Sequence, residues 1–582
     1  MRIECLDHSG ARPTTFLIEF KGNTILYNCP LEVKSLSKLT GIDDASPPPQ
    51  QQQQSLSSGG GFNHLDTLLS RIVNNTKSIQ DGSLLDLCDD GCVFRTVNFS
   101  LVDLNQIDVV LVANSEMMLG LPFLTEYLGY KGKIIATEPT IEFARQRMEE
   151  LVAYHGRQGS FISPGSAIHF SQVGSMNRQC VDEQWRSLYT LRDIKLCMQK
   201  IKPVRFNEHL SLYETTTLVP YSSGYSLGSA NWCLEATDRK VVLMSTSSIV
   251  SNRHPALFDM SIMEKADVVL VSDVRTGDQN DTDHIRKRIL GHVAMTLQSQ
   301  KNVLFPISMI GNIFDLIGDL ARHLKALNMP VSFYVVSPVA RTSLEYANIL
   351  GEWMTAGHQD TVNTAQKPLE HGQLQQEKEL FAYDSLQDAN DIKEPCVLFT
   401  GDHTCLRKGP VVSAVEHWGG DQRNICIITD PETLASQDLP SSRMKMVPLI
   451  LNTRVSLWEV GSILGTACRI TPPPHIIIPD MLGSDRFKER WEMEHPGATQ
   501  LHTINPGESV SIEFTNKMEM IVISEELAAR LAPQAAHKDG VFYAIAPVTG
   551  SLAMYNNNYE LQPITDLCDE YLLNPNHHPA AS

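Results

Sequence analysis

The sequence lacks the local motifs from which metal and nucleotide sites are usually built. Its 582 residues include 19 histidines and 12 cysteines, yet no H-x-H, H-x-x-H, H-E-x-x-H or C-x-x-C motif occurs. A dinuclear metal hydrolase needs several histidine and carboxylate ligands that converge on two ions, and structural zinc usually uses paired cysteines. The sequence also has no P-loop and no well-placed G-x-G-x-x-G motif. We therefore expect neither a metal nor a cofactor.

Long apolar runs and an excess of positive charge are missing as well. No apolar stretch approaches the ~20 residues that a membrane helix requires, and the first residues form no apolar signal segment. The 48 Lys+Arg and 67 Asp+Glu give a formal net charge of −19. Because phosphate binding relies on Lys and Arg, this balance argues against direct nucleic-acid binding as the main activity. We expect a soluble protein without a membrane partner, whose contact with RNA is indirect or weak.

The sequence does contain a regular alternation of strand and helix patterns. Near the start, a Lys21-Gly22 turn joins two short apolar strands, as in a β-hairpin. Buried-type strands alternate with amphipathic helices from residue 108 onward, and the alternation recurs over 282–480. Such patterns indicate parallel, helix-covered sheets, so the predicted fold class is α/β. The Pro-, Gln- and Gly-rich stretch at 46–62 cannot form a core and is predicted to be a surface loop.

Gly224-Tyr225-Ser226-Leu227-Gly228 matches the G-x-S-x-G pattern of a serine-hydrolase nucleophile elbow. In such an elbow a helix follows the serine, whereas this sequence continues with a strand pattern. A glycine-bracketed loop is therefore favoured over an esterase site.

Two other polar clusters follow predicted strands. Several carboxylates lie at or after the end of the strand VVLVSD and could hold a metal. The favoured interpretation is a solvated surface in which Asp281 or Thr282 is the N-cap of the following helix. Gly401-Asp402-His403 ends another strand, where open α/β sheets often bind ligands, but a plain turn is favoured there. The members of the first cluster are Asp273, Asp278, Asp281, Asp283 and His284.

Four segments together resemble a metallo-β-lactamase domain that carries a β-CASP insertion. They read FKGNTILYNCP, IDVVLVANSEMMLGLPFLTEYLGYKGKIIATEPT, PYSSGYSLGSANW and KNVLFPISMIGNIFDLIGDL. The resemblance implies an αββα metallo-β-lactamase sandwich, an inserted Rossmann-like β-CASP domain and a small, mostly β, C-terminal module. The implied boundaries are 1–275 and 437–500 for the two parts of the sandwich, 276–436 for the β-CASP domain and 501–582 for the module.

The positions that hold metal ligands in active members of this family carry other residue types here. The segment that matches their H-x-H-x-D-H motif reads Asn114-Ser115-Glu116-Met117-Met118-Leu119, and no choice of register restores a histidine. Amides, hydroxyls and thioethers are poor zinc ligands beside imidazole and carboxylate, and Glu116, Asp480 and Asp273 would hold at most one hard cation weakly. The resemblance thus implies a pseudoenzyme without catalytic, cofactor or metal residues. Its degenerate ligand positions are Asn28, Asn114, Glu116, Met118, Leu119, Tyr225, Ser247, Asn452 and Asp480.

Inactive members of this family serve RNA 3′-end processing, and the resemblance implies a non-catalytic scaffold subunit of the nuclear Integrator complex, with some protein in the cytoplasm. The implied partners are the active RNA endonuclease, subunit 11, together with subunit 4 and the larger complex with RNA polymerase II. The implied role is 3′-end processing of small nuclear RNA and cleavage of nascent transcripts.

The predicted C-terminal module suggests where a partner binds. Residues 501–582 hold three basic and ten acidic side chains, which favours a basic, strand-donating partner over a merely soluble module. Relatives usually carry a further C-terminal α/β domain, which we expect this chain to lack. Three alternatives stay open: an inactive 100 kDa-type subunit of the cleavage and polyadenylation factor, a residual metal-dependent nuclease, and a hydrolase acting through Ser226.

Overall fold

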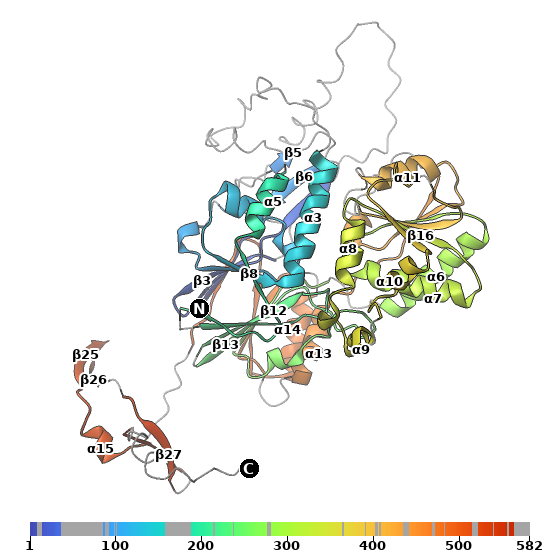
Figure 1. Ribbon diagram of the computed structural model, residues 1–582. Coiled ribbons are helices and arrows are strands. Elements are labelled where there is room, and N and C mark those ends of the chain that lie inside the picture. Colours follow the sequence, from blue (N-terminus) through green and yellow to red (C-terminus); the bar gives the residue numbers. More distant parts are fainter. Residues whose placement is uncertain are drawn as a thin grey trace, which may run out of the picture. The chain divides into compact units, whose positions relative to one another are not determined.

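The computed structural model divides into two compact units, Met1–Ile512 and Glu513–Ser582, each of which is described by itself (Figure 1). The predicted loop at 46–62 and the residues Asp278, Asp402 and His403 lie outside the described residues. The described residues are 1–7, 14–35, 85–87, 92–97, 99, 102–156, 188–213, 216–236, 238–275, 281–363, 366–389, 391–401, 406, 409–434, 442–467, 472–481, 483–514, 522–538, 541–546, 548–555 and 558–563.

Two seven-stranded mixed sheets form one part of the first unit. The predicted hairpin near the start is confirmed, because β2 and β3 pair antiparallel around Lys21 and Gly22, which both have positive φ. The first sheet has the order β23 (Ser509–Ser511), β1 (Arg2–Cys5), β2 (Phe16–Phe20), β3 (Asn23–Tyr27), β7 (Val109–Leu111), β8 (Lys133–Thr137) and β9 (Ile201–Val204). The second has the order β10 (Leu210–Leu212), β11 (Thr216–Ser222), β12 (Ala230–Ala236), β13 (Arg239–Met244), β14 (Val268–Val271), β21 (His475–Pro479) and β22 (Gln500–Ile504).

The two mixed sheets face each other, and helices cover their outer faces. The Tyr27 hydroxyl of the first sheet donates to the Leu243 carbonyl of the second at 3.3 Å, and the Trp232 indole donates to the Val112 carbonyl at 3.0 Å. Since strands place alternate side chains on opposite faces, the outward residues of each sheet form a second apolar layer against helices. The covering helices are α3 (Glu138–Gly156) and α5 (Leu191–Met198) on the first sheet, and α13 (Leu457–Ala467) and α14 (Ser484–Glu494) on the second.

A six-stranded parallel sheet forms the other part of the first unit. Alternate residues of its strands point to opposite faces, so that α6, α7 and α8 cover one face and α11 covers the other. The strand order is β17 (Leu380–Tyr383), β16 (Ser332–Val336), β18 (Cys396–Thr400), β15 (Val303–Pro306), β19 (Ile425–Ile428) and β20 (Lys445–Pro448). The helices are α6 (Thr282–Gln298), α7 (Asn312–Ala326), α8 (Ala340–Ala347) and α11 (Pro410–Trp418). The structure thus has the predicted α/β architecture.

Helix α3 connects the first mixed sheet with the parallel sheet. Its Glu150 is fully buried, accepts from Tyr154 at 2.9 Å and from Ser337 beyond β16 at 2.5 Å, and pairs with the buried Arg147. Gly401, at the end of β18, allows this approach, since a Cβ there would meet Glu150 at 1.9 Å. A buried carboxylate is tolerated only when it is paired and hydrogen-bonded. The carboxyl end of the parallel sheet therefore accommodates this chain's own helix.

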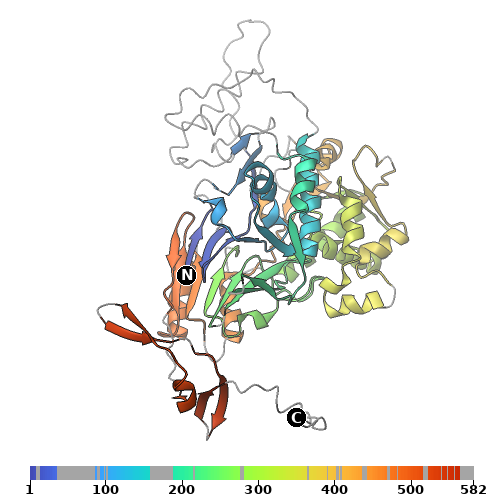
Figure 2. The same ribbon diagram turned by 60° about the vertical axis from the view of Figure 1, so that its left-hand side comes forward.

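The strands just after residue 500 complete the two mixed sheets instead of forming a separate module. β22 pairs with β21, and β23 pairs with β1, which places the orange strands beside the blue N-terminal strands in Figure 2. The division between the units consequently falls at residue 512 and not at the predicted 501, because these strands pair with β21 and β1 of the first unit. The second unit contains β24 (Val522–Ile523), α15 (Glu525–Ala528), β25 (Gln534–Lys538), β26 (Val541–Ile545), β27 (Ser551–Tyr555) and β28 (Asn558–Gln562).

Several shorter elements complete the description. Across the described ranges, no helix combines the length and apolar composition that crossing a bilayer requires. The remaining elements are β4 (Leu31–Ser35), β5 (Leu85–Leu87), β6 (Cys92–Thr96), η2 (Leu104–Gln106), η3 (Glu116–Met118), η4 (Phe123–Tyr127), η5 (Met260–Met263), η6 (Gly351–Trp353), α9 (Ala356–Asn363), α10 (Glu370–Gln376) and α12 (Pro431–Leu434).

Candidate functional site

Most of the degenerate ligand positions lie where strands of the two mixed sheets end. Asn28 follows β3, Asn114 follows β7 by three residues, and Ser247 follows β13 by three residues. The carboxylate of Asp273 joins them from the end of β14. The fold therefore does bring these positions together, and their side-chain contacts decide what the centre can do.

Asn28 is fully buried and its amide is fixed by hydrogen bonds at both ends. Its Oδ1 accepts from the Ala113 amide at 2.9 Å, and its Nδ2 donates to the Thr14 carbonyl at 2.9 Å and to the Ser245 hydroxyl at 3.5 Å. The φ of 68° is one that asparagine tolerates better than most residues. Because Nδ2 faces a carbonyl, this side chain acts as a neutral link between strands and has no oxygen free to bind a cation there.

Asn114 and the residues after it form a capped turn whose side chains enter the core. Asn114 Oδ1 accepts from the amides of Glu116 and Met117 at 3.1 and 3.2 Å, and so fixes the turn that leads into η3. Met118 is fully buried and Leu119 is 3% exposed, and both pack in the apolar layer under the first sheet. These two positions therefore contribute packing, and they supply no ligand atoms to the centre.

The second sheet contributes a set of hydroxyl and amide groups that bond to one another. Ser247 Oγ lies 2.9 Å from Asn231 Nδ2 and 3.1 Å from Asn231 Oδ1, and it also donates to the Ser245 carbonyl at 2.9 Å. Thr246 accepts from Asn114 at 3.0 Å and itself donates to Asp273. A continuous hydrogen-bonded path thus runs from the first sheet to the Asp273 carboxylate.

Arg454 supplies the positive charge of this centre. Its Nε lies 3.4 Å from Oδ2 of Asp273, whose side chain is 2% exposed. A second arginine, Arg253, donates to the Tyr225 carbonyl at 2.7 Å and pairs with Asp315 of α7 at 3.3 Å. Burial raises the pKa of Tyr225, and the negative charge of Asp273 adds to the shift while the Arg454 guanidinium opposes it. Tyr225 is thus held as a neutral phenol beside two fixed cations.

The last two ligand positions are Asn452 and Asp480. Asn452 Oδ1 accepts from the Arg454 amide at 3.2 Å, so it shapes the turn that presents the arginine. Asp480 is exposed, and its Oδ2 accepts from Asn505 Nδ2 at 3.1 Å.

The residues at the centre do not fit the two metal ions that its position in the fold would suggest. Among the described residues of the centre, the buried carboxylate is that of Asp273, and it already pairs with Arg454 and accepts from Thr246. Throughout the part of the chain that the structure describes, no three His, Cys, Asp or Glu side chains gather where they could hold a metal. Two-metal hydrolysis needs several anionic or imidazole ligands around each ion. The hydrogen bonds and the ion pair of the centre link the two mixed sheets.

Ser226 is not arranged as a nucleophile. Its Oγ lies 2.5 Å from the hydroxyl of Ser229, and no described histidine makes a hydrogen bond to it. The loop leads into strand β12 at Ala230, as the sequence predicts, whereas a nucleophile elbow leads into a helix. Asp281 is likewise the predicted N-cap, because its carboxylate accepts from the His284 amide at 2.9 Å.

Sequence reasoning found the degenerate positions but missed the groups that replace the ligands. Arg454, Thr246 and Asn231 form much of the centre; Asn231 lies within the segment PYSSGYSLGSANW, but none of the three was singled out. One feature of the sequence could have pointed to Arg454: it lies two residues after Asn452, which is one of the degenerate ligand positions.

Comparison with known proteins agrees with this architecture. Residues 84–270 match the family model described as "Metallo-beta-lactamase superfamily domain". With its facing mixed sheets and the polar centre at their strand ends, the chain is a member of the metallo-β-lactamase class. It is 30% identical to "Integrator complex subunit 9 homolog" of Nematostella vectensis, over 99% of this chain and 86% of that protein. The chain belongs to the Integrator complex subunit 9 family.

Other relatives extend the comparison. "Integrator complex subunit 9" of Homo sapiens is 28% identical over 97% of this chain and 84% of that protein. "Endoribonuclease YSH1" of Yarrowia lipolytica is 20% identical over 56% of this chain and 36% of that protein. Similarity to a protein named as a nuclease is thus weaker and covers a smaller share of both chains.

Proposed function

We propose that this chain is a non-catalytic scaffold subunit of an Integrator complex. The observation that carries the proposal is the centre itself, where Asp273 pairs with Arg454 and the neighbouring amides and hydroxyls bond to one another. The metallo-β-lactamase fold is retained, while the groups that would bind metals are engaged in contacts within the protein. Membership in the Integrator complex subunit 9 family supports the assignment of the chain to this complex.

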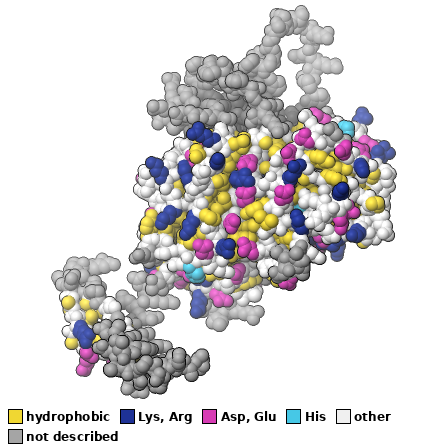
Figure 3. Space-filling model, in the orientation of Figure 1, with side chains coloured by type: hydrophobic (Ala, Val, Ile, Leu, Met, Phe, Trp, Pro, Cys, Tyr) yellow, Lys and Arg dark blue, Asp and Glu magenta, His cyan; other side chains and the backbone are white. Residues whose placement is uncertain are grey.

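The proposed direct partners are the active RNA endonuclease, subunit 11, and subunit 4 of the same complex. In the nucleus such an assembly would process small nuclear RNA and cut nascent RNA polymerase II transcripts. We further propose that the six-stranded parallel sheet belongs to a β-CASP domain at 276–436, and that the acidic C-terminal residues take part in pairing. Figure 3 supports only limited RNA contact on the face in view, since Lys and Arg are interspersed there with Asp and Glu.

The first experiment is affinity purification of the tagged chain from nuclei, followed by mass spectrometry. We expect Integrator subunits, with the endonuclease subunit in equal amount. Recovery of cleavage and polyadenylation factors in their place would assign the chain to the alternative inactive subunit of that complex.

The second experiment addresses catalysis directly. The purified chain is assayed for bound metal by inductively coupled plasma mass spectrometry and for cleavage of single-stranded RNA with added zinc or manganese. We expect no cleavage above the rate in buffer. Metal-dependent cleavage by the chain that disappears in an Asp273→Asn variant would overturn the non-catalytic assignment, whereas cleavage unchanged by this substitution indicates a contaminant.

A further inference from the structure

A cationic surface lies on the parallel-sheet part of the first unit, away from the polar centre. It is formed by the outer side of α6 and by the edge strand β20, and we call it the α6–β20 surface. Arg288 and Met295 are exposed, and residues four and seven positions apart on a helix share one side, so Arg288, His292 and Met295 form a single row. The α6–β20 surface consists of Arg288, Gly291, His292, Met295 and Lys445.

The positive charges of this surface lie close to one another and lack carboxylate partners. Val447 of β20 packs in the same apolar cluster as Ile289 and Val293 of α6, and Lys445, two residues before Val447, lies on the same face of the sheet. Burial lowers the pKa of His292, and the charges of Lys445 and Arg288 lower it further, in agreement with this placement. Among the residues that the structure describes, no carboxylate pairs with Arg288 or Lys445. By contrast, Arg286 on the same helix pairs with Asp319, and Arg423 pairs with Asp421 at 2.9 Å. Like charges left unpaired in a chain of net charge −19 favour an anionic partner.

Gly291 leaves an open space in the middle of the row. A Cβ at this position would meet no atom within 4 Å, so nothing within the fold requires a glycine there. Glycine is nevertheless the least favourable residue inside a helix after proline. A glycine in such a place allows the backbone of a partner to approach the helix closely.

The apolar residue of the surface, Met295, indicates that the partner is a protein and not a nucleic acid. Met295 is 58% exposed, and a flexible thioether is well suited to contact an apolar side chain of a partner. Proteins that bind single-stranded nucleic acid commonly stack bases on aromatic side chains, and this row contains no Phe, Tyr or Trp. The edge of β20 itself is protected, because Pro448 lacks an N–H and Lys445 is charged, so addition of a further strand is disfavoured.

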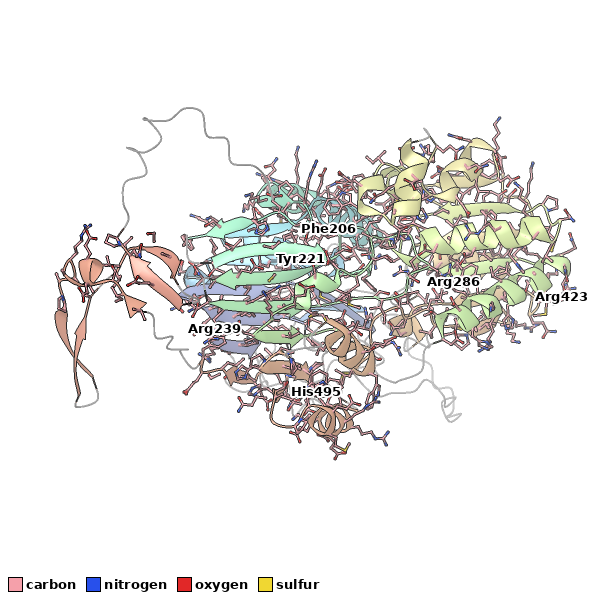
Figure 4. All side chains as sticks on the ribbon, turned by 90° about the horizontal axis from the view of Figure 1, so that it is seen from below. Phe206, Tyr221, Arg239, Arg286, Arg423 and His495 are labelled. Atoms are coloured by element: carbon pink, nitrogen blue, oxygen red, sulfur yellow. The ribbon has the colours of Figure 1, made fainter. Side chains whose placement is uncertain are left out.

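We propose that the α6–β20 surface binds an acidic segment of a partner protein that places an apolar side chain between Arg288 and Met295. The carboxylates of the segment would neutralise Arg288 and Lys445, and its backbone would pass over Gly291. Figure 4 shows Arg286 toward the middle of the molecule and Arg423 at the outer end of the parallel-sheet part. Both arginines are paired within the chain, which makes them suitable controls.

The test uses the full chain and two defined probes. One is a synthetic 15-residue peptide of Glu, Asp and Leu, and the other is a 30-nucleotide single-stranded RNA of mixed sequence. We expect the peptide to bind at low micromolar concentration, at least tenfold more tightly than the same peptide with Ser in place of Leu. The RNA should bind more weakly than the acidic peptide at 150 mM salt.

Substitutions then assign the binding to this surface. Arg288→Glu with Lys445→Glu should weaken peptide binding at least tenfold, and Gly291→Leu should weaken it similarly while leaving the charge unchanged. The matched control, Arg423→Glu, should change the affinity for the peptide less than twofold. Tighter binding of RNA, equal binding of the two peptides, or an equal effect of Arg423→Glu would each overturn the proposal.

Discussion

Arg454 Nε lies 3.4 Å from Asp273 Oδ2, in the polar centre where the two mixed sheets meet. The arginine is always charged, so its charge does not depend on the supply of a metal or on pH near neutrality. Asp273 is nearly inaccessible to solvent, and its φ of 48° lies in the left-handed region. The pair therefore joins the end of β14 to the loop before α13 as a permanent part of the fold.

Removing the arginine should destabilise the protein strongly. Arg454→Met leaves the buried Asp273 carboxylate without its cation, and we expect the free energy of unfolding in urea to fall by about 3–5 kcal/mol. The double variant Asp273→Asn with Arg454→Met should recover at least half of this loss, because asparagine also tolerates the left-handed conformation.

An exposed ion pair provides the control for this measurement. Lys21 and Asp238 lie 2.8 Å apart, with side chains 38% and 51% exposed. Lys21→Met should change the unfolding free energy by no more than about 1 kcal/mol. A loss from Arg454→Met as small as this would show that the buried pair contributes little.

Introducing a histidine at Met118 should not create a metal site. The side chain is fully buried in the apolar layer, so Met118→His places a polar ring without a partner in the core. We expect a loss of about 2–4 kcal/mol and no gain in bound zinc by mass spectrometry. Met118→Leu, which nearly conserves volume, should lose less than about 1.5 kcal/mol. Stoichiometric zinc in the histidine variant would contradict our description of the centre.

The contact between α3 and the parallel sheet should depend on the missing side chain of Gly401. A Cβ there would meet Glu150 at 1.9 Å and the Tyr154 hydroxyl at 2.4 Å, and Gly401→Ala should cost about 1–3 kcal/mol. Gly420→Ala is the matched control, because its Cβ would meet nothing within 4 Å. Thermal unfolding of the two variants gives the comparison, and equal melting temperatures would refute the close approach.

His371 should make the stability of the fold sensitive to acid. The side chain is fully buried beside the Leu344 carbonyl, and burial lowers its pKa from 6.5 to about 4. The folded state thus keeps this imidazole neutral while the unfolded chain protonates it, so stability is complete above pH 6.5 and is lost as the pH falls toward 4. The loss should reach about 3 kcal/mol.

Comparison with His371→Met isolates this contribution. Urea unfolding of both proteins between pH 7 and pH 4 should show a difference in unfolding free energy that shrinks as the pH falls. A constant difference across this range would mean that His371 does not titrate as its burial indicates.

The sequence was sufficient to predict the α/β architecture. Alternation of short β-branched runs with amphipathic helices is a local signal, and it predicted helices such as α6 and the hairpin of β2 and β3 correctly. The ligand positions, by contrast, came only from the resemblance to the metallo-β-lactamase family, because no local pattern marks them. Asn28, Asn114 and Ser247 are buried because the strands that they follow end inside the sandwich, whereas Asp480 is exposed.

Contacts between distant segments could not be predicted in the same way. Arg454 meets Asp273 across 181 residues of sequence, and Ser337 meets Glu150 across 187. No local pattern records such pairs, because each depends on how whole elements pack. The boundary near residue 512 was missed for the same reason, since β22 and β23 look like any short strands until their partners are known.

The position of β23 has a consequence for the order in which the protein is made and folded. β23 pairs with β1, and Met1 donates to the Ile512 carbonyl at 3.1 Å, so β1 cannot complete its pairing until β23, near the end of the same unit, has been made. All strands of the parallel sheet, by contrast, lie between residues 303 and 448. We expect the inserted sheet to form during synthesis while the edge of the first mixed sheet stays open. Newly made chains would then need protection by chaperones until residue 512 has emerged.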